Sequence, residues 1–222
     1  MRFDVFTIFP GMFDSYLKES ILHRAIKRKI VEIRVHDLRK FASGKHKKTD
    51  DRPYGGGPGM VMSAEPILRA LSSLKLRRLA TKVILFSPAG DKLTNSYADA
   101  RARSNSRMVL ICGRYEGVDA RVKIATKKMG FFVDEISIGP YVLTGGELPS
   151  MVLIDSVVRR IPGVIGKHES LEEQRFGIGI PVYTKPEILV IGGSTYRVPA
   201  LLLGGNHKKI NEWRKKRSKK FL

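Results

Sequence analysis

The chain repeats one pattern three times: a short apolar run, typical of a buried strand, is followed at once by a loop that contains glycine. These runs are Lys82–Phe86, Met108–Cys112 and Phe131–Ile138. Strands that alternate with loops and helices form an α/β domain with a largely parallel sheet, and ligands bind at the carboxyl ends of its strands. We therefore expect the three loops to meet at one edge of a sheet and to form a ligand site there.

The other patterns along the chain predict the same fold class. Strand patterns occur at Arg2–Phe9 and Ile30–His36, and helical periods occur at Met12–Lys29, Glu65–Ser73, about 95–104 and about 147–160. Between them, the polar and glycine-rich stretch Asp37–Gly59 predicts a long loop. Long loops inside compact domains usually have a function.

The loop after the third strand, Ser137–Pro149, places several glycines at a strand-to-helix junction. Clustered glycines mark special backbone geometry or close approach to a ligand, because glycine loses more conformational freedom on folding than other residues. A turn that only starts a helix is the alternative interpretation. No loop matches G-x-x-x-x-G-K-[ST], and none follows a strand as G-x-G-x-x-G. We therefore expect a ligand with many polar atoms, such as an adenine nucleoside, rather than a nucleoside triphosphate.

Charge is the strongest feature of the composition, with 41 Lys and Arg against 21 Asp and Glu and a net charge of +20. Such an excess costs self-repulsion and usually serves to bind a polyanion. Nucleic acid is favoured over a membrane surface, because the basic residues do not form one amphipathic segment. No apolar run reaches the length of a membrane span, no signal-peptide pattern begins the sequence, and the single Cys112 excludes an internal disulfide. We expect a cytoplasmic protein with no membrane partner.

The composition changes after Pro162, where the last long helical pattern stops. We expect a first domain at 1–162, a linker at 163–179 and a small basic domain at 180–222. The segment from His207 to the end has eight Lys or Arg and one Glu, with a helical pattern that begins at Asn206. A solvated tail and an anion-binding helix are both open interpretations of it.

Several long motifs, in order along the whole chain, are similar to those of one known family. The motifs are Phe9-Pro10 with Met12-Phe13, the stretch from Lys45 to Met60, Ser87-Pro88, the stretch from Cys112 to Asp119, Ser137–Pro149, and Gly205-Asn206-His207 with Trp213-Arg214. On these motifs the chain resembles the bacterial tRNA (guanine-N1)-methyltransferases, the TrmD family. The resemblance implies a SPOUT-type α/β fold with a trefoil knot and a small, mainly helical C-terminal domain.

The resemblance also implies a cofactor, a substrate and an assembly. The family binds S-adenosylmethionine (AdoMet) in the knot, works as a homodimer with the tRNA site between subunits, and methylates N1 of the guanine just 3′ of the anticodon. Carried over, the AdoMet-binding residues are Phe86, Ser87, Pro88, Gly90, Gly113, Tyr115, Glu116, Ser137, Ile138, Gly139, Pro140, Tyr141, Val142, Leu143, Gly145, Gly146 and Pro149. The expected RNA contacts are Lys47, Lys48, Asn206, His207, Lys208 and Arg214.

Methylation at guanine N1 requires a general base near N1 and positive charge near O6. The resemblance assigns the second role to Arg159 and a target-guanine contact to Asp50. For the base, the family has an aspartate where this chain has Gln174, and an amide does not accept a proton. Three alternatives follow: Glu173 or its neighbour Glu172 supplies the carboxylate, Asp50 assists, or the protein binds tRNA with impaired or altered transfer.

Two further positions depart from the family pattern. Pro140 replaces the usual aspartate and removes an amide donor beside the cofactor loop. Lys185 replaces the usual arginine and gives up bidentate phosphate geometry. The five histidines are scattered along the sequence, so it predicts no metal site and leaves a role for a divalent cation such as Mg²⁺ open.

Overall fold

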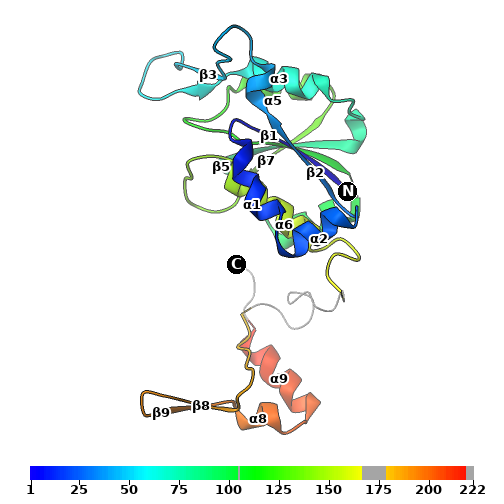
Figure 1. Cartoon of the computed structure of the whole chain (residues 1–222), viewed down its shortest axis with the longest axis vertical. Coiled ribbons are helices and arrows are strands. Elements are labelled where there is room, and N and C mark those ends of the chain that lie inside the picture. Colours follow the sequence, from blue (N-terminus) through cyan, green and yellow to red (C-terminus); the bar gives the residue numbers. More distant parts are fainter. Residues whose placement is uncertain (105, 167–178, 219–222) are drawn as a thin grey trace. The chain divides into compact units, whose positions relative to one another are not determined.

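The computed structural model describes residues 1–104, 106–166 and 179–218, which form two compact units, Met1–Ile165 and Gly166–Leu222 (Figure 1). The predicted linker, 163–179, falls largely outside the described residues. None of the described helices is long and apolar enough to cross a membrane.

The first unit contains a five-stranded sheet in the order β2-β1-β6-β5-β7, and every neighbouring pair is parallel. The strands are β1 (Arg2–Thr7), β2 (Glu32–Asp37), β5 (Thr81–Lys92), β6 (Arg107–Ile111) and β7 (Phe132–Ser137). All three predicted glycine-loop strands are therefore adjacent, since β6, β5 and β7 lie side by side. The predicted α/β class with a parallel sheet is confirmed, whereas the knot stays a prediction from the family.

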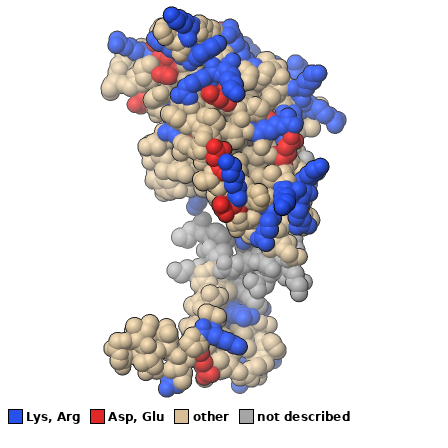
Figure 2. Space-filling model, in the orientation of Figure 1, with Lys and Arg blue, Asp and Glu red and all other residues tan. Residues whose placement is uncertain are grey.

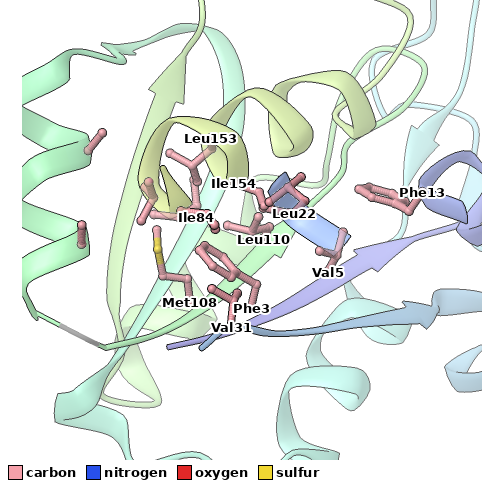
Figure 3. Close-up of a cluster of buried hydrophobic side chains, with 14 of the residues drawn as sticks. Phe3, Val5, Phe13, Leu22, Val31, Ile84, Met108, Leu110, Leu153 and Ile154 are labelled. Atoms are coloured by element: carbon pink, nitrogen blue, oxygen red, sulfur yellow. The ribbon is translucent and has the colours of Figure 1, made fainter. Parts of the chain in front are cut away.

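Alternating side chains along each strand supply two apolar cores, one on each face of the sheet. Ile84, Met108 and Leu110 contribute to one core, and their neighbours Val83 and Val109 contribute to the other. This alternation arises because successive strand residues point to opposite faces. Figure 3 shows the first core, where Phe3 and Leu110 of the sheet meet Leu153 and Ile154 of the covering helix.

Helices cover both faces of the sheet, as Figure 1 shows. On the side of the first core lie α1 (Asp14–Leu17), α2 (Ser20–Lys27), α4 (Asn95–Ser104) and α6 (Glu147–Val158). On the side of the second core lie α3 (Ala64–Ser73), α5 (Arg121–Lys128) and the 3-10 helix Leu38–Phe41. The result is a three-layer α/β/α unit.

The observed helices differ from the expected ones in two places. The single helix expected at Met12–Lys29 is divided into the 3-10 helix Pro10–Phe13, α1 and α2, and Ser20 has a positive φ of 53° at the break. The helix α5 was not expected, because its sequence contains only a few apolar residues between lysines and arginines.

Strand β5 is interrupted at the point where it reaches the site. Phe86 and Asp91 both pair with Ile136 of β7, so residues 87–90 bulge out of the sheet and the chain then returns to it. A Cβ on Gly90 would lie 2.7 Å from the backbone nitrogen of Ile136. Gly90 therefore allows the returning chain to cross closely over β7.

The long loop between β2 and α3 contains a short antiparallel pair of its own, β3 (Asp50–Asp51) with β4 (Val61–Met62). The second unit contains the hairpin β8 (Ile188–Ile191) with β9 (Ser194–Arg197), then α8 (Ala200–Leu203) and α9 (His207–Arg217). Helix α9 begins where the sequence predicts, and the Asn206 side chain caps it by accepting a hydrogen bond from the Lys209 N–H at 3.1 Å.

Candidate functional site

A cavity of about 220 Å³ lies at the carboxyl ends of β5, β6 and β7, where the three glycine-bearing loops meet. It is lined by Phe86, Ser87, Pro88, Gly113, Arg114, Tyr115, Glu116, Gly117, Ile136, Ser137, Ile138, Gly139, Tyr141, Val142, Leu143, Thr144, Gly145, Gly146 and Pro149. The parallel sheet brings these loops to one edge, since all its strands run in the same direction.

Most of the residues expected to bind a cofactor line this one cavity, although they come from three separate stretches of sequence. Gly90 and Pro140 are the exceptions among them, because neither belongs to the lining. Gly90 lies against the backbone of Glu135 and Ile136, so its small size serves the close approach of β5 to β7.

Two adjacent glycines bring the loop after β7 against the loop after β6. The Gly146 N–H donates to the Gly113 carbonyl oxygen at 2.8 Å, and Arg114 and Gly145 form an antiparallel bridge. A Cβ on Gly146 would lie 2.6 Å from the Cys112 Cα, a distance that real Cβ atoms essentially never show. Only glycine therefore lets these two walls of the cavity meet backbone to backbone.

The returning end of the long loop supports the wall formed by Gly113–Gly117. The Glu116 N–H donates to the Met60 carbonyl oxygen at 3.0 Å, and the Met62 N–H donates to the Gly117 carbonyl oxygen at 2.9 Å. These backbone bonds hold the wall in a conformation that includes a positive φ of 59° at Tyr115. The long loop thus contributes to the site by fixing the cavity wall.

The chemistry of the cavity favours binding over proton transfer. Its titratable side chains are Arg114, Tyr115, Glu116 and Tyr141, and Glu116 is the one carboxylate among the lining residues. The remaining lining residues offer backbone groups, hydroxyls and apolar surface. Such a surface suits a nucleoside, whose edges accept and donate hydrogen bonds and whose ring packs against apolar side chains.

A group of buried polar side chains adjoins the cavity lining at Arg114 and Gly146. Glu147 is fully buried at the start of α6, where its Oε1 accepts a hydrogen bond from the Thr7 hydroxyl at 2.6 Å and its Oε2 lies 2.9 Å from Arg114 Nε. Burial, and then the charge of Glu147, raise the pKa of the Cys112 thiol well above its ordinary value. Cys112 is therefore a neutral packing residue that contacts the Ser150 hydroxyl at 3.1 Å.

The residues expected to be catalytic lie outside the cavity lining. Asp50 is half-buried in β3 opposite Met62, and its Oδ1 accepts a hydrogen bond from the Thr49 hydroxyl at 3.3 Å. Arg159 is half-buried and caps the end of α6, where its N–H donates to the Asp155 carbonyl oxygen at 3.1 Å. Glu172, Glu173 and Gln174 lie outside the described residues.

The expected RNA contacts fall into both units. Lys47 and Lys48 are exposed on the long loop of the first unit. Asn206, His207, Lys208 and Arg214 lie at the start and on the body of α9 in the second unit. Among the described residues, no three His, Cys, Asp or Glu side chains gather as metal ligands would.

Four residues that line the cavity were not among those expected from the sequence: Arg114, Gly117, Ile136 and Thr144. Arg114 gave a usable signal, because a cation between glycines in a loop that follows a buried strand is costly unless it has a partner. Glu147 and Thr7 carry no such signal in the sequence. A glutamate in the first turn of a helix is usually solvated, so nothing local indicates that Glu147 is buried against Thr7.

Comparison with known proteins matches the family model described as tRNA (Guanine-1)-methyltransferase TrmD over residues 1–221. Similar relatives named tRNA (guanine-N(1)-)-methyltransferase occur in Dictyoglomus turgidum (48% identical over 99% of this chain and 86% of the relative) and in Thermomicrobium roseum (50% identical over 97% of this chain and 78% of the relative). A third, from Geobacillus kaustophilus, is 45% identical over 98% of this chain and 86% of the relative.

Proposed function

Because the chain belongs to the tRNA (guanine-1)-methyltransferase family, we propose that it transfers a methyl group from AdoMet to N1 of the guanine just 3′ of a tRNA anticodon. The observation that carries the proposal is the cavity at the carboxyl ends of β5, β6 and β7. It gathers, from three distant stretches, nearly all the residues that the resemblance assigns to AdoMet.

The cavity fits an adenine nucleoside with a charged tail. Gly113, Gly145 and Gly146 present backbone groups without side chains, so the ligand can approach the main chain closely. Leu143, Ile138 and Pro149 offer apolar surface for the adenine ring. When bound there, AdoMet supplies an electrophilic methyl group on its sulfonium.

The remaining chemistry falls to side chains outside the cavity. Guanine N1 carries a proton at neutral pH, so a general base must remove it before N1 can attack. We assign that base to Glu173, with Glu172 and Asp50 as the competing carboxylates. Arg159 stabilises the negative charge that develops on O6 as the proton leaves.

The charge distribution supports tRNA as the substrate. Figure 2 shows that Lys and Arg outnumber Asp and Glu on the face of the first unit that is in view. In the second unit, α9 contains six Lys or Arg and one Glu, and the Arg217 guanidinium lies 4.3 Å from the centre of the Trp213 ring. Cations beside an aromatic ring suit an RNA strand, which offers phosphates and stacking bases.

Exposed apolar side chains beside the site support a homodimer. Leu148 and Val152 are spaced i, i+4 on α6 and are 50% and 42% exposed, and Val142 in the adjoining loop is 82% exposed. Such a patch at the mouth of a site is costly in a monomer. We propose that a second copy covers it and that the tRNA site lies between the two subunits.

A second candidate function is a tRNA-binding homologue with impaired or altered transfer. The observation that favours it is Gln174, which stands where the family has an aspartate. Both candidates bind tRNA, so only methyl transfer separates them.

The deciding experiment incubates the purified protein with methyl-labelled AdoMet and unmodified tRNA that has guanine after the anticodon. We expect label in that tRNA and none in a matched tRNA with adenine at the same position. If the protein binds tRNA but transfers no methyl group, the proposed methyltransferase activity is overturned and the second candidate is supported.

A substitution in the predicted linker tests the assignment of the base. Glu173→Gln should lower the turnover number about 10²–10⁴-fold, because the amide cannot take the proton from N1. AdoMet affinity should be unchanged. Glu172→Gln is the matched control, and a wild-type rate for Glu173→Gln would exclude Glu173 as the base.

A further inference from the structure

Glu147 holds a buried charge between two groups that come from different strand ends, those of β1 and β6. Its side chain is fully buried. Thr7, the last residue of β1, donates to one carboxylate oxygen at 2.6 Å, and Arg114, in the loop after β6, lies 2.9 Å from the other. The Arg114 N–H is not aligned with that oxygen, so this second contact is an ion pair rather than a hydrogen bond.

The rest of the Arg114 side chain contacts the same loops. Its Nη1 donates to the Thr144 carbonyl oxygen at 3.3 Å, in the wall that follows β7. Its Nη2 lies 3.0 Å from Met12 Sδ, and its guanidinium lies 4.6 Å from the centre of the Phe9 ring, both in the segment after β1. One side chain therefore joins the loops that follow β1, β6 and β7.

The main chain is adapted to this arrangement. Arg114 and Gly145 form an antiparallel bridge, and a Cβ on Gly145 would lie 2.3 Å from Arg114 Nε. The guanidinium thus occupies the space that any larger residue at position 145 would need. The Arg114 side chain therefore lies between the two cavity walls, which contain Gly113–Gly117 and Thr144–Gly146.

We propose that Arg114 and Glu147 form a positioning pair that sets the spacing of these two cavity walls and thereby the affinity for AdoMet. The inference rests on the proposed function, because it takes AdoMet as the ligand of the cavity. A buried charge that loses its partner is strongly unfavourable, so removing either member should let the walls move apart.

The competing explanation is that the pair only stabilises the fold. The chain offers a matched control in Asp4, a second fully buried carboxylate that bonds Arg107 at 2.6 Å and His36 at 2.8 Å. Asp4 lies outside the cavity lining. Loss of its charge should cost stability without touching the cavity walls.

The experiment compares Glu147→Gln and Arg114→Lys with Asp4→Asn in the full-length protein. The measurements are the AdoMet dissociation constant by calorimetry, the melting temperature, and tRNA binding. We expect Glu147→Gln to weaken AdoMet binding about tenfold or more, equivalent to about 1.4 kcal/mol, while tRNA affinity stays within about twofold. Arg114→Lys, which retains the charge but loses the planar fork, should fall between Glu147→Gln and the wild type.

Asp4→Asn should lower the melting temperature at least as much as Glu147→Gln while leaving the AdoMet dissociation constant unchanged. Equal AdoMet affinity in Glu147→Gln and the wild type would overturn the positioning role, and so would equal weakening in Asp4→Asn. Failure of the wild type itself to bind AdoMet would instead overturn the proposed function, so the two failures are distinguishable.

Discussion

Asp4 and Glu147 are both fully buried carboxylates of the same sheet unit, yet they differ in what they hold together. Asp4 accepts hydrogen bonds from Arg2, His36 and Arg107, which belong to β1, β2 and β6. Glu147 contacts one cation, Arg114, and one hydroxyl, Thr7. The Asp4 cluster therefore joins strands to strands, whereas the Glu147 cluster joins loops to the sheet.

The pKa of Asp4 reflects its several partners. Burial alone would raise the pKa of the Asp4 carboxyl, but hydrogen bonds from His36, Arg107 and Arg2 outweigh it and hold that pKa well below its usual range. Asp4 is thus a well-compensated structural charge. Glu147 has fewer partners and contacts Arg114 of the cavity lining, which is the arrangement expected where a charge positions a binding site.

The largest expected effect is at the backbone contact between the two cavity walls. Gly146→Ala should abolish measurable AdoMet binding in calorimetry, because the added Cβ would lie 2.6 Å from the Cys112 Cα and 2.9 Å from the Gly113 nitrogen. Gly11→Ala is the matched control, since no atom lies within 4 Å of a Cβ at that position. Wild-type affinity in Gly146→Ala would show that the walls need not meet this closely.

A stability effect of intermediate size is expected at the strand cluster. Asp4→Asn should lower the free energy of unfolding by about 3 kcal/mol, because it breaks a buried ion pair and leaves cations without their acceptor. Urea denaturation measures this change. A loss below about 1 kcal/mol would mean that Asp4 is no more important than a surface charge.

The smallest effect is a dependence of stability on pH. The folded-state pKa of Asp4 is depressed, so its contribution is fully present above the unfolded pKa of about 4 and is lost as the pH falls below it. Between about pH 4 and pH 2.5, the wild type should lose up to about 1.4 kcal/mol per pH unit more than Asp4→Asn. Parallel curves for the two proteins would contradict the depressed pKa.

The sequence predicts the sheet well because its strands and loops have local signals. Lys82–Phe86 and Met108–Cys112 are short apolar runs, and each is followed by a loop that contains glycine. Strand β5 contains the first run and β6 contains most of the second. The order of the strands brings those loops together, so most of the expected cofactor residues share one cavity. The family's knot and the identity of the base stay predictions.

Other features depend on tertiary contacts that leave no local pattern. The positive φ at Ser20 divides the expected helix after β1, although the apolar period continues across it. Gly90 looks like a loop glycine, but its size serves the approach of β5 to β7. Glu147 looks like an ordinary residue of a first helical turn, and only the fold brings Thr7 and Arg114 to it.

Amide hydrogen exchange of the full-length protein with and without AdoMet tests the central claim most directly, because protection reports local opening along the chain. The cofactor should slow exchange in all three loops, 86–90, 113–117 and 137–146, and leave the amides around the Asp4 cluster at Arg2, His36 and Arg107 unchanged. Protection confined to one loop, or centred on the Asp4 cluster, would contradict the assignment of the cavity to AdoMet.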